Sequence, residues 1–231
     1  MNHFNKFRVQ KRLLLWTFVL VGIGIPANAQ RMSPMQQDFD RKARGSVEVA
    51  NADTFPKFLA CNAEGFDVDD HGKIALHPLD PDLHVRIASE RTELGPNQSK
   101  QISFDATPAT VPAWFAVFCE FSPVKRQTGV TVNIAIFSVI LVHGLEKAPP
   151  SIAVTAKYVG GKVIVELENT GMALERVNSC TISGKQGKVE IPKFLLFPKR
   201  KRIVEADWAA VTAPQRVRIQ VGKKTLEIPV N

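Results

Sequence analysis

The residues best suited to metal binding or proton transfer in this sequence lie in one polar segment. Its histidines are His71, His77 and His84. Aspartates flank them: Asp69, Asp70, Asp80 and Asp82. Such a group could bind a metal ion or act in acid–base chemistry, but the spacing matches no ligand pattern, and a metal site needs ligands that converge on one point. We therefore expect these histidines to be solvated loop residues.

Cysteines are the other candidates for chemistry, at Cys61, Cys119 and Cys180. No Cys-x-x-Cys pair occurs, and no spacing of cysteine and histidine resembles a zinc site. In an oxidising compartment, three cysteines permit one disulfide and leave one thiol. From the residues alone, Cys61 and Cys119 are either buried thiols or a cross-strand bridge.

Motifs of catalysis are missing from the sequence. It has no glycine-rich phosphate loop and no Gly-x-Ser-x-Gly nucleophile elbow. Serine, histidine and aspartate occur, but a catalytic triad is defined by geometry and not by spacing. We predict that the protein is not an enzyme and uses no cofactor and no metal. A hydrolase without a recognisable motif remains an alternative, which activity screens with a broad range of substrates would test.

The formal net charge of the chain is +8 at pH 7. Part of this charge lies at the N-terminus, on Lys6, Arg8, Lys11 and Arg12. Removing these four charges from +8 leaves +4 for the rest of the chain. The remaining basic residues are spread along the sequence, which is weak evidence for a nucleic acid partner, and we predict none. The basic run at residues 199–202 could contact an anionic surface, but we favour a strand or hairpin edge whose like charges discourage pairing.

The N-terminus has the pattern of a secretion signal. A basic region up to Arg12 precedes an uncharged apolar stretch at residues 13–25, which is too short to span a bilayer comfortably. Pro26 and the small residues of Ala27-Asn28-Ala29 follow. This pattern predicts cleavage after Ala29 and export to the periplasm, with residues 1–29 as signal peptide and Gln30 as the mature start. The alternative is an uncleaved N-terminal anchor.

After residue 29 the sequence reads as strands almost throughout. Short runs rich in Val, Ile, Phe and Thr are separated by Gly, Pro, Asn and Asp, and no amphipathic helix is evident. Lys147-Ala148-Pro149-Pro150 interrupts the pattern, since two prolines stop both sheet and helix and stiffen a linker. The pattern predicts an all-β protein with two immunoglobulin-like β-sandwich domains, at residues 30–147 and 148–231.

The most unusual predicted strand covers residues 130–142, the longest extended run in the sequence. One face is almost entirely aliphatic, with Val130, Val132, Ile134, Ile136, Ser138, Ile140 and Val142. The opposite face is mixed in its first half and apolar in its second half. An apolar strand of this kind is either part of a sandwich core, or an edge strand that is a docking surface for another chain. The residues alone leave both interpretations open.

Several segments together resemble the PapD-like family of periplasmic pilus chaperones, over nearly the whole mature chain. Ser33-Pro34 is similar to the opening of the family's first strand, and Leu94-Gly95-Pro96-Asn97 to the turn before a later strand. The other segments that resemble the family are residues 45–51, 56–60, 113–123, 130–142, 168–171 and 194–202. The resemblance implies two immunoglobulin-like domains set at an angle.

The resemblance also implies a function. A chaperone of this kind completes an unfinished fimbrial subunit by donor-strand complementation and delivers it to an outer-membrane usher. By resemblance the donor residues are Val132, Ile134 and Ile136, with Val130 next in register. A self-capping homodimer is a further possibility. The alternative is a divergent PapD-like protein that serves another envelope or secretion assembly without pilin transfer.

The family binds the subunit's terminal carboxylate with an arginine on the first strand and a lysine on the long strand. The corresponding positions here are Gln36 and Leu141, and neither carries a charge. A glutamine or leucine cannot replace a charge-assisted contact with a carboxylate. Arg41, Lys42 and Arg44 are near Gln36 in sequence, but they lie beyond the expected cleft position. The missing pair favours the alternative without pilin transfer.

The coarse strand order of such a fold bears on the cysteines. Cys61 is expected on the third strand and Cys119 on the penultimate strand of the first domain, and these strands are neighbours in an immunoglobulin-like sheet. We predict a disulfide between them, provided that their Cβ atoms approach within about 4.5 Å. Cys180 would then be the free thiol.

Overall fold

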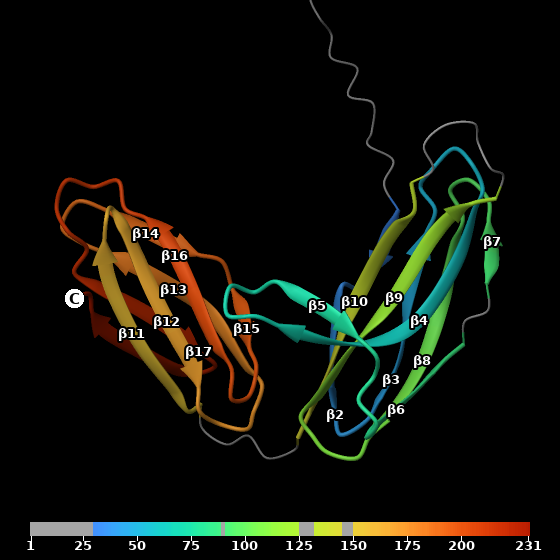
Figure 1. The fold of residues 1–231 in the computed structure, drawn as a ribbon, viewed down its shortest axis with the longest axis horizontal. Helices are drawn as coiled ribbons and strands as arrows, with labels where there is room; N and C mark the ends of the chain where they lie inside the picture. Colours follow the sequence, from blue (N-terminus) through green and yellow to red (C-terminus); the bar gives the residue numbers. More distant parts are fainter. Residues whose placement is uncertain (1–29, 89–90, 125–131, 145–149) are drawn as a thin grey trace, which may run out of the picture.

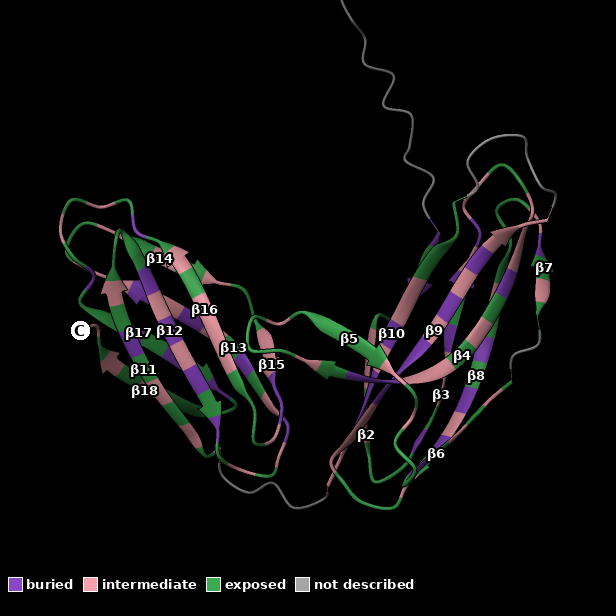
Figure 2. Cartoon of the chain, in the orientation of Figure 1, coloured by how far each residue is buried: buried purple, intermediate pink, exposed green. Residues whose placement is uncertain are grey.

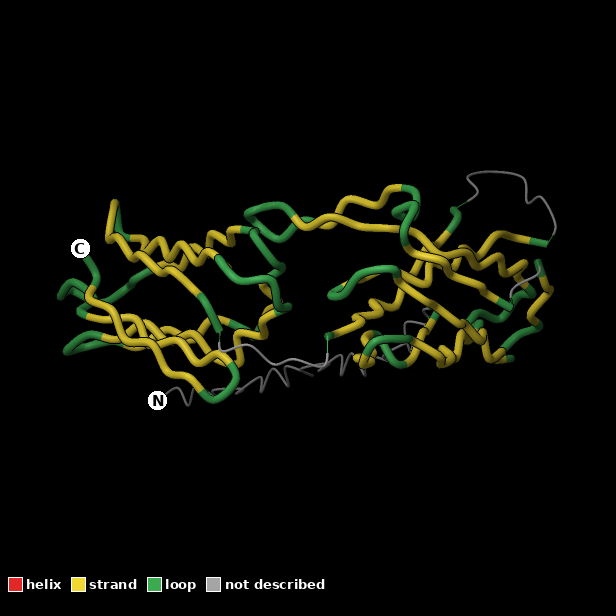
Figure 3. Tube along the Cα trace, turned by 90° about the horizontal axis from the view of Figure 1, so that it is seen from below, coloured by secondary structure: helices red, strands yellow, loops and turns green. Residues whose placement is uncertain are grey.

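The computed structural model describes residues 30–88, 91–124, 132–144 and 150–231. Within these ranges every regular element is a strand, and loops join them (Figure 3). The strands form two lobes that lie side by side, and each lobe contains two sheets (Figure 1). The prediction of an all-β fold is therefore confirmed. None of the described segments is a helix that could cross a bilayer.

The first sandwich contains strands β1 to β10. One sheet has the order β1-β3-β8-β6, with bounds β1 Arg31–Ser33, β3 Ala43–Ala50, β8 Ser99–Pro108 and β6 Leu83–Ile87. The other sheet has the order β2-β10-β9-β4-β5, and β7 also pairs with β4. Its bounds are β2 Gln36–Asp40, β10 Ile134–His143, β9 Ala113–Pro123, β4 Lys57–Val68, β5 Ile74–His77 and β7 Thr92–Leu94.

The second sandwich contains strands β11 to β18. One sheet has the order β11-β12-β16, with bounds β11 Ile152–Val159, β12 Lys162–Asn169 and β16 Lys201–Asp207. The other has the order β14-β13-β17-β18, and β15 also pairs with β13. Its bounds are β14 Lys188–Ile191, β13 Glu175–Ser183, β17 Arg216–Val221, β18 Lys224–Pro229 and β15 Phe194–Leu196.

Each lobe has its own hydrophobic core between its two sheets (Figure 2). Alternation of side chains produces these cores, as β17 shows: Val217, Ile219 and Val221 are buried, while the residues between them are exposed. Cys180 lies in the second core. Burial raises the pKa of its thiol to about 11.

The first strand of the chain changes sheets. β1 pairs with β3 in one sheet, whereas β2, which begins only three residues after β1 ends, runs parallel to β10 in the other. Pro34 lies at the crossing and has no N–H to continue the β1 ladder. Because of this crossing, β2 begins to pair with β10 only from the middle of β10, at Val139.

Strand β4 projects beyond the first sandwich. Its residues 57–64 pair with β9, while residues 65–68 pair only with β5. The end of β4 and the whole of β5 therefore form a hairpin, which Figure 1 shows reaching towards β15 of the second lobe.

An aromatic and aliphatic cluster joins the two lobes. Phe66 and Trp114 of the first sandwich contact Phe197 of the second, with ring centroids 5.8 Å and 5.0 Å from that of Phe197. Leu141 and Leu174 are buried in the same cluster. Edge-to-face ring contacts and apolar burial hold the lobes together at this point.

Two buried asparagines fix loops at matching places in the two lobes. The Asn51 side chain donates to the carbonyl O of Leu94, and the Asn169 side chain donates to the carbonyl O of Leu196, each at 3.1 Å. Both side chains are fully buried, and these bonds satisfy amide groups that would otherwise be costly to bury.

Candidate functional site: an open strand edge beside a cleft

Strand β10 is paired on both sides along only part of its length. β9 pairs with it from Ile134 to Val142 on one side. On the other side, β2 pairs only with residues 139–143. Among the described residues, no strand pairs with the outer side of residues 134–137. The first half of β10 is therefore an open sheet edge, which can act as a template for another strand.

One hydrogen bond shows which backbone groups of β10 face outwards. The amide N of Val139 donates to the carbonyl O of Met35 at 2.9 Å, on the side of β10 away from β9. Along a strand, the backbone groups of alternate residues point to the same side. The N–H and C=O groups of Ala135 and Phe137 therefore point out of the open edge, where an added strand could bond to them.

The aliphatic row of β10 emerges gradually from the core. Ser138 and Ile140 are fully buried, and Ile136 packs partly buried against the first core. Ile134 is 37% exposed, and Val132, just before the strand, is 63% exposed. Apolar side chains that continue a buried row into solvent suit a docking surface better than a completed core.

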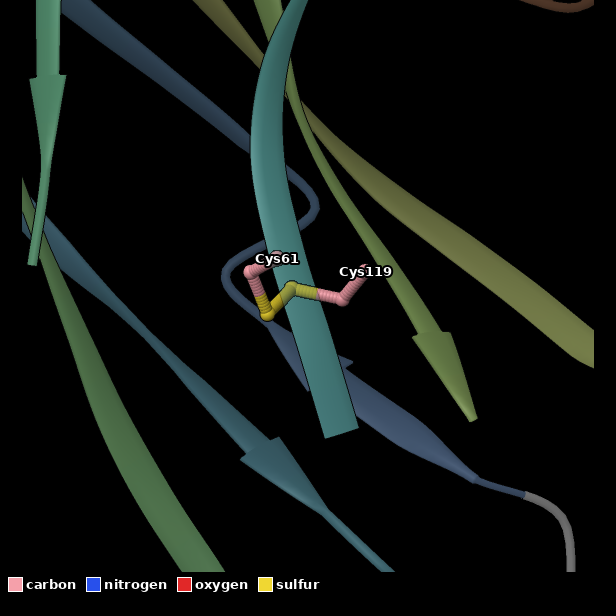
Figure 4. Close-up of a disulfide and its surroundings, with 2 residues drawn as sticks. All are labelled: Cys61 and Cys119. Carbon is pink, nitrogen blue, oxygen red and sulfur yellow. A yellow bond between two sulfur atoms is a disulfide. The ribbon is translucent and has the colours of Figure 1, made fainter. Parts of the chain in front are cut away.

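A disulfide joins the two strands that lie next to this half of β10 in the sheet. Ile134 lies opposite Phe121 of β9, and Ile136 lies opposite Cys119. Cys119 in turn lies opposite Cys61 of β4, and a disulfide joins the two cysteines (Figure 4). Because the disulfide links β4 to β9, the open edge rests on two strands that cannot separate.

The prediction of one strand over residues 130–142 is wrong at its start. β10 begins at Ile134, and Val132 and Asn133 precede it in irregular chain. Val130 lies outside the described residues. The β-branched pattern continues upstream in sequence, but the register with β9 ends at Ile134, so Val132 and Asn133 have no partner residues on β9 to hold them extended. Among the strands of the described residues, β4 is the longest, with 12 residues against 10 for β10.

A cleft of about 310 Å³ lies between the two sandwiches, next to this edge. Its apolar wall includes Phe66, Val139 and Phe197. Its cationic residues are Arg176, Lys193 and Arg202, all from the second sandwich. The cleft can therefore receive a group with an apolar body and a negative charge.

Gln36 and Leu141, the two positions aligned with the family's carboxylate-binding residues, lie in different surroundings. Gln36 lines the cleft and donates through its side-chain amide to Asp38 at 3.1 Å. Leu141 is fully buried in the cluster between the lobes and is not among the residues that line the cleft. A charged side chain at position 141 would have to be buried among aromatic rings, which would be costly without a partner.

Asp38 connects the two sandwiches beside the cleft. His143 Nε2 lies 2.8 Å from Asp38 Oδ1, and Arg176 Nη2 donates to Asp38 Oδ2 at 3.0 Å. Burial alone would raise the pKa of Asp38, but hydrogen bonds from His143 and Gln36 and the charge of Arg176 outweigh burial and lower it below the ordinary value. The carboxylate is therefore ionised at neutral pH and holds Arg176 at the cleft.

The other cleft cations are less engaged. No carboxylate among the described residues lies within ion-pair distance of Lys193, which is exposed. Arg202 is half-buried and lies over the Phe194 ring, 5.6 Å from its centroid. Burial lowers the pKa of Arg202, and the Asp69 carboxylate partly offsets this. The cleft therefore presents positive charge that the protein itself does not fully neutralise.

The remaining sequence candidates lie elsewhere. The expectation of loop histidines holds for His71, which lies in a turn, and is wrong for His77 in β5 and His84 in β6. No group of three metal-ligating side chains occurs within the described residues. Arg44 is exposed and pairs with Asp105 at 2.6 Å, away from the cleft. Arg200 in the basic run pairs with Asp67 of the first sandwich, and β16 is an edge strand, as we favoured for this run.

Sequence reasoning missed Arg176 and Lys193, and it noted Arg202 only as part of the basic run at residues 199–202, for which a strand edge was favoured over an anionic contact. Arg176, Lys193 and Arg202 lie far along the chain from the first sandwich, on or next to three different strands. No motif or spacing links them to β10. Only the packing of the two sandwiches brings them to one side of a cleft.

Comparison with solved structures agrees with this fold. A Salmonella enterica SafB chaperone, solved in complex with the SafA pilin, is 12% identical, and the match covers 87% of this chain and 96% of the other with a TM-score of 0.55. The chain has the fold of the fimbrial chaperones. The E. coli chaperone DraB matches with 12% identity, 87% and 97% coverage and a TM-score of 0.54.

A further chaperone of this fold, YadV, is 8% identical over 86% of this chain and 99% of its own, with a TM-score of 0.56. No protein-family model matches the sequence, and no curated protein matches it either. The similarity to these solved structures is one of fold, at sequence identities of 8% to 12%.

Proposed function

We propose that the protein is a periplasmic chaperone that binds an incomplete fimbrial-type subunit by donor-strand complementation and passes it to an outer-membrane usher. The observation that carries the proposal is the open outer side of residues 134–137, combined with exposed Val132 and Ile134 in the same row. The N-terminal signal pattern and the matching fold of chaperones solved with a pilin or a tip adhesin support it.

The binding step follows from the chemistry of the edge. A strand of the subunit would bond to the outward N–H and C=O groups of Ala135 and Phe137. Val132, Ile134 and Ile136 would then enter apolar sites of the subunit, since side chains alternate along a strand. Each branched side chain that becomes fully buried contributes about 1.5 kcal/mol or more, which is roughly tenfold in affinity.

The subunit's terminal carboxylate would bind in the cleft between the sandwiches. We propose that Lys193 and Arg202, with Arg176 held by Asp38, replace the charge that Gln36 and Leu141 lack. These cations come from the opposite side of the cleft, and their hydrogen-bond donors suit a carboxylate.

Aspartate substitutions on the open row test the proposal. The variants Val132→Asp and Ile134→Asp would be co-expressed with a fimbrial-type subunit in the periplasm, and subunit levels and co-purification measured. The matched control is Val159→Asp, because Val159 is 61% exposed on β11 and Val132 is 63% exposed. We expect at least a tenfold loss for the first two variants and none for the control. Equal behaviour of all three would refute strand donation.

The absence of charge at Gln36 and Leu141 favours a second candidate function. A divergent protein of this fold could serve another envelope or secretion assembly and transfer no pilin. In that case the Ile134→Asp variant would leave subunit levels unchanged. A periplasmic pull-down that recovers no fimbrial-type subunit would support this second function.

A further inference from the structure

The β4–β5 hairpin of the first sandwich touches the edge strand of the second. Asp67 Oδ1 accepts a hydrogen bond from Arg200 Nη2 at 2.7 Å. The backbone N of Ile203 donates to the carbonyl O of Asp70, also at 2.7 Å. Because β12 already pairs with the inner side of β16 at Ile203, this second bond occupies the outer side of β16.

A third contact depends on a glycine. Gly72 lies in the turn of the hairpin with a φ of 83°, a conformation that other residues rarely adopt. A Cβ atom at this position would lie 1.3 Å from Arg202 Nη1. Arg202 Cζ lies 5.6 Å from the centroid of the Phe194 ring, and Arg202 Nε is buried, so a guanidinium displaced by a new Cβ would have to leave these surroundings. Gly72 thus forms a notch that receives Arg202.

The position of the hairpin also determines the shape of the cleft. Gly72 and Ile74 belong to the hairpin and line the cleft, and Arg202 lines it from the second sandwich. Any change in how the hairpin sits on β16 would move this cationic residue relative to Val139 of β10, which lines the same cleft.

We propose that the β4–β5 hairpin is a clasp that fixes the orientation of the two sandwiches, and that Gly72 and Arg202 are its positioning residues. The clasp sets how far the cationic side of the cleft stands from the open edge of β10. It acts within the chain itself, so the inference holds whichever ligand the cleft binds.

Residual dipolar couplings of backbone amides test the clasp directly. Two lobes held rigidly together share one alignment tensor, whereas lobes that move independently show two. The variant Gly72→Ala would be compared with Gly161→Ala, because Gly161 has a nearly equal φ of 81° but nothing within 4 Å of an added Cβ. Both substitutions strain the backbone, and only the first displaces Arg202.

We expect the alignment tensors of the two lobes to separate in Gly72→Ala and to coincide in Gly161→Ala and the wild type. Removing the obstructing side chain, in the double variant Gly72→Ala with Arg202→Ala, should bring the tensors closer together than in Gly72→Ala alone. Coinciding tensors in Gly72→Ala, or equal separation in both glycine variants, would overturn the proposal.

A second variant keeps the test decisive if Gly72→Ala does not fold. Asp67→Asn removes one charge of the exposed pair with Arg200 and leaves both cores intact. We expect a smaller separation of the tensors in this variant, and the same effect from added salt, which screens exposed charges. Insensitivity of the lobe orientation to both changes would contradict the clasp.

Discussion

In the first sandwich, residues 134–137 of β10 have a partner strand on one side only. In the second sandwich, the outer sides of the edge strands β11 and β16 carry backbone bonds. On the outer side of β11, Tyr158 N donates to Asn231 O and Asn231 N donates to Ala156 O. On the outer side of β16, the hairpin bonds to Ile203. The two sandwiches share a general architecture and differ in which edges their own chain covers.

This difference shows that an open edge results from the path of the chain more than from its composition. Both sandwiches have apolar strands with alternating burial. Only in the first does a strand cross between sheets, at Pro34, and so leave half of a neighbouring strand uncovered. The second lobe supplies the cationic residues of the cleft, and the first lobe supplies the open edge of β10.

The largest expected effect concerns the disulfide, which braces only the first sandwich. Replacing both Cys61 and Cys119 by alanine should lower the free energy of unfolding of that lobe by about 2–4 kcal/mol, because the unfolded chain is no longer constrained. The second lobe should be unaffected, so thermal unfolding by calorimetry should split into two transitions. A single transition shifted as a whole would mean that the lobes unfold together. Mass spectrometry with and without reductant tests the pairing itself.

The next effect separates backbone bonding from side-chain burial at the open edge. Ala135→Pro removes an N–H that faces outwards and that β9 does not use, and proline is tolerated on an open edge. We expect subunit binding to weaken about tenfold with little change in melting temperature, because a lost main-chain bond and the proline ring both hinder an added strand. The control Ala135→Val keeps the N–H. Normal binding by the proline variant would argue against strand addition.

A smaller effect is expected from the second lobe's contribution to the cleft. Lys193→Ala should weaken subunit binding several-fold, since an exposed cation contributes about 1 kcal/mol or less to a partly screened contact. Lys185→Ala is the control, because Lys185 is also exposed but does not line the cleft. The loss should diminish in high salt. Equal affinities of the two variants would place the carboxylate elsewhere.

The smallest expected effect is a pH dependence of the contact between Asp38 and Arg176. The pKa of Asp38 is lowered in the folded protein, so its ion pair with Arg176 stabilises the contact above the ordinary value of 3.8 and is lost as the pH falls through the lower folded value. Dipolar couplings or melting temperatures measured on acidification should show this loss in the wild type. The variant Asp38→Asn should respond less over the same range.

Much of the fold could be predicted from the sequence, since alternation and turn residues mark most strands. Residues 113–123, one of the segments that resemble the family, coincide with β9. The limits of β10 could not be predicted, because β-branched residues favour extended chain whether or not a partner strand is present.

The candidate site was less accessible to sequence reasoning. Alternation placed Ile134 and Ile136 on one aliphatic face, and resemblance to the family named them as donor residues. Their side chains do lie at the open end of the row. The openness itself depends on where β2 meets β10, which no local pattern encodes. The position of the cleft cations depends on how one sandwich packs against the other. In the sequence Gly72 looks like an ordinary turn glycine, and only the structure shows that its position contacts the Arg202 side chain.

The burial of Cys180 has a consequence for how this chain matures. Three thiols allow three different pairings, and only one of these leaves both lobes intact. Once the second core has closed, a thiol with a pKa of about 11 yields almost no thiolate, and a thiolate is what attacks another sulfur. Closure of the second lobe thus withdraws the odd cysteine from thiol–disulfide exchange, and neither scrambled isomers nor cross-linked dimers should form from the folded protein.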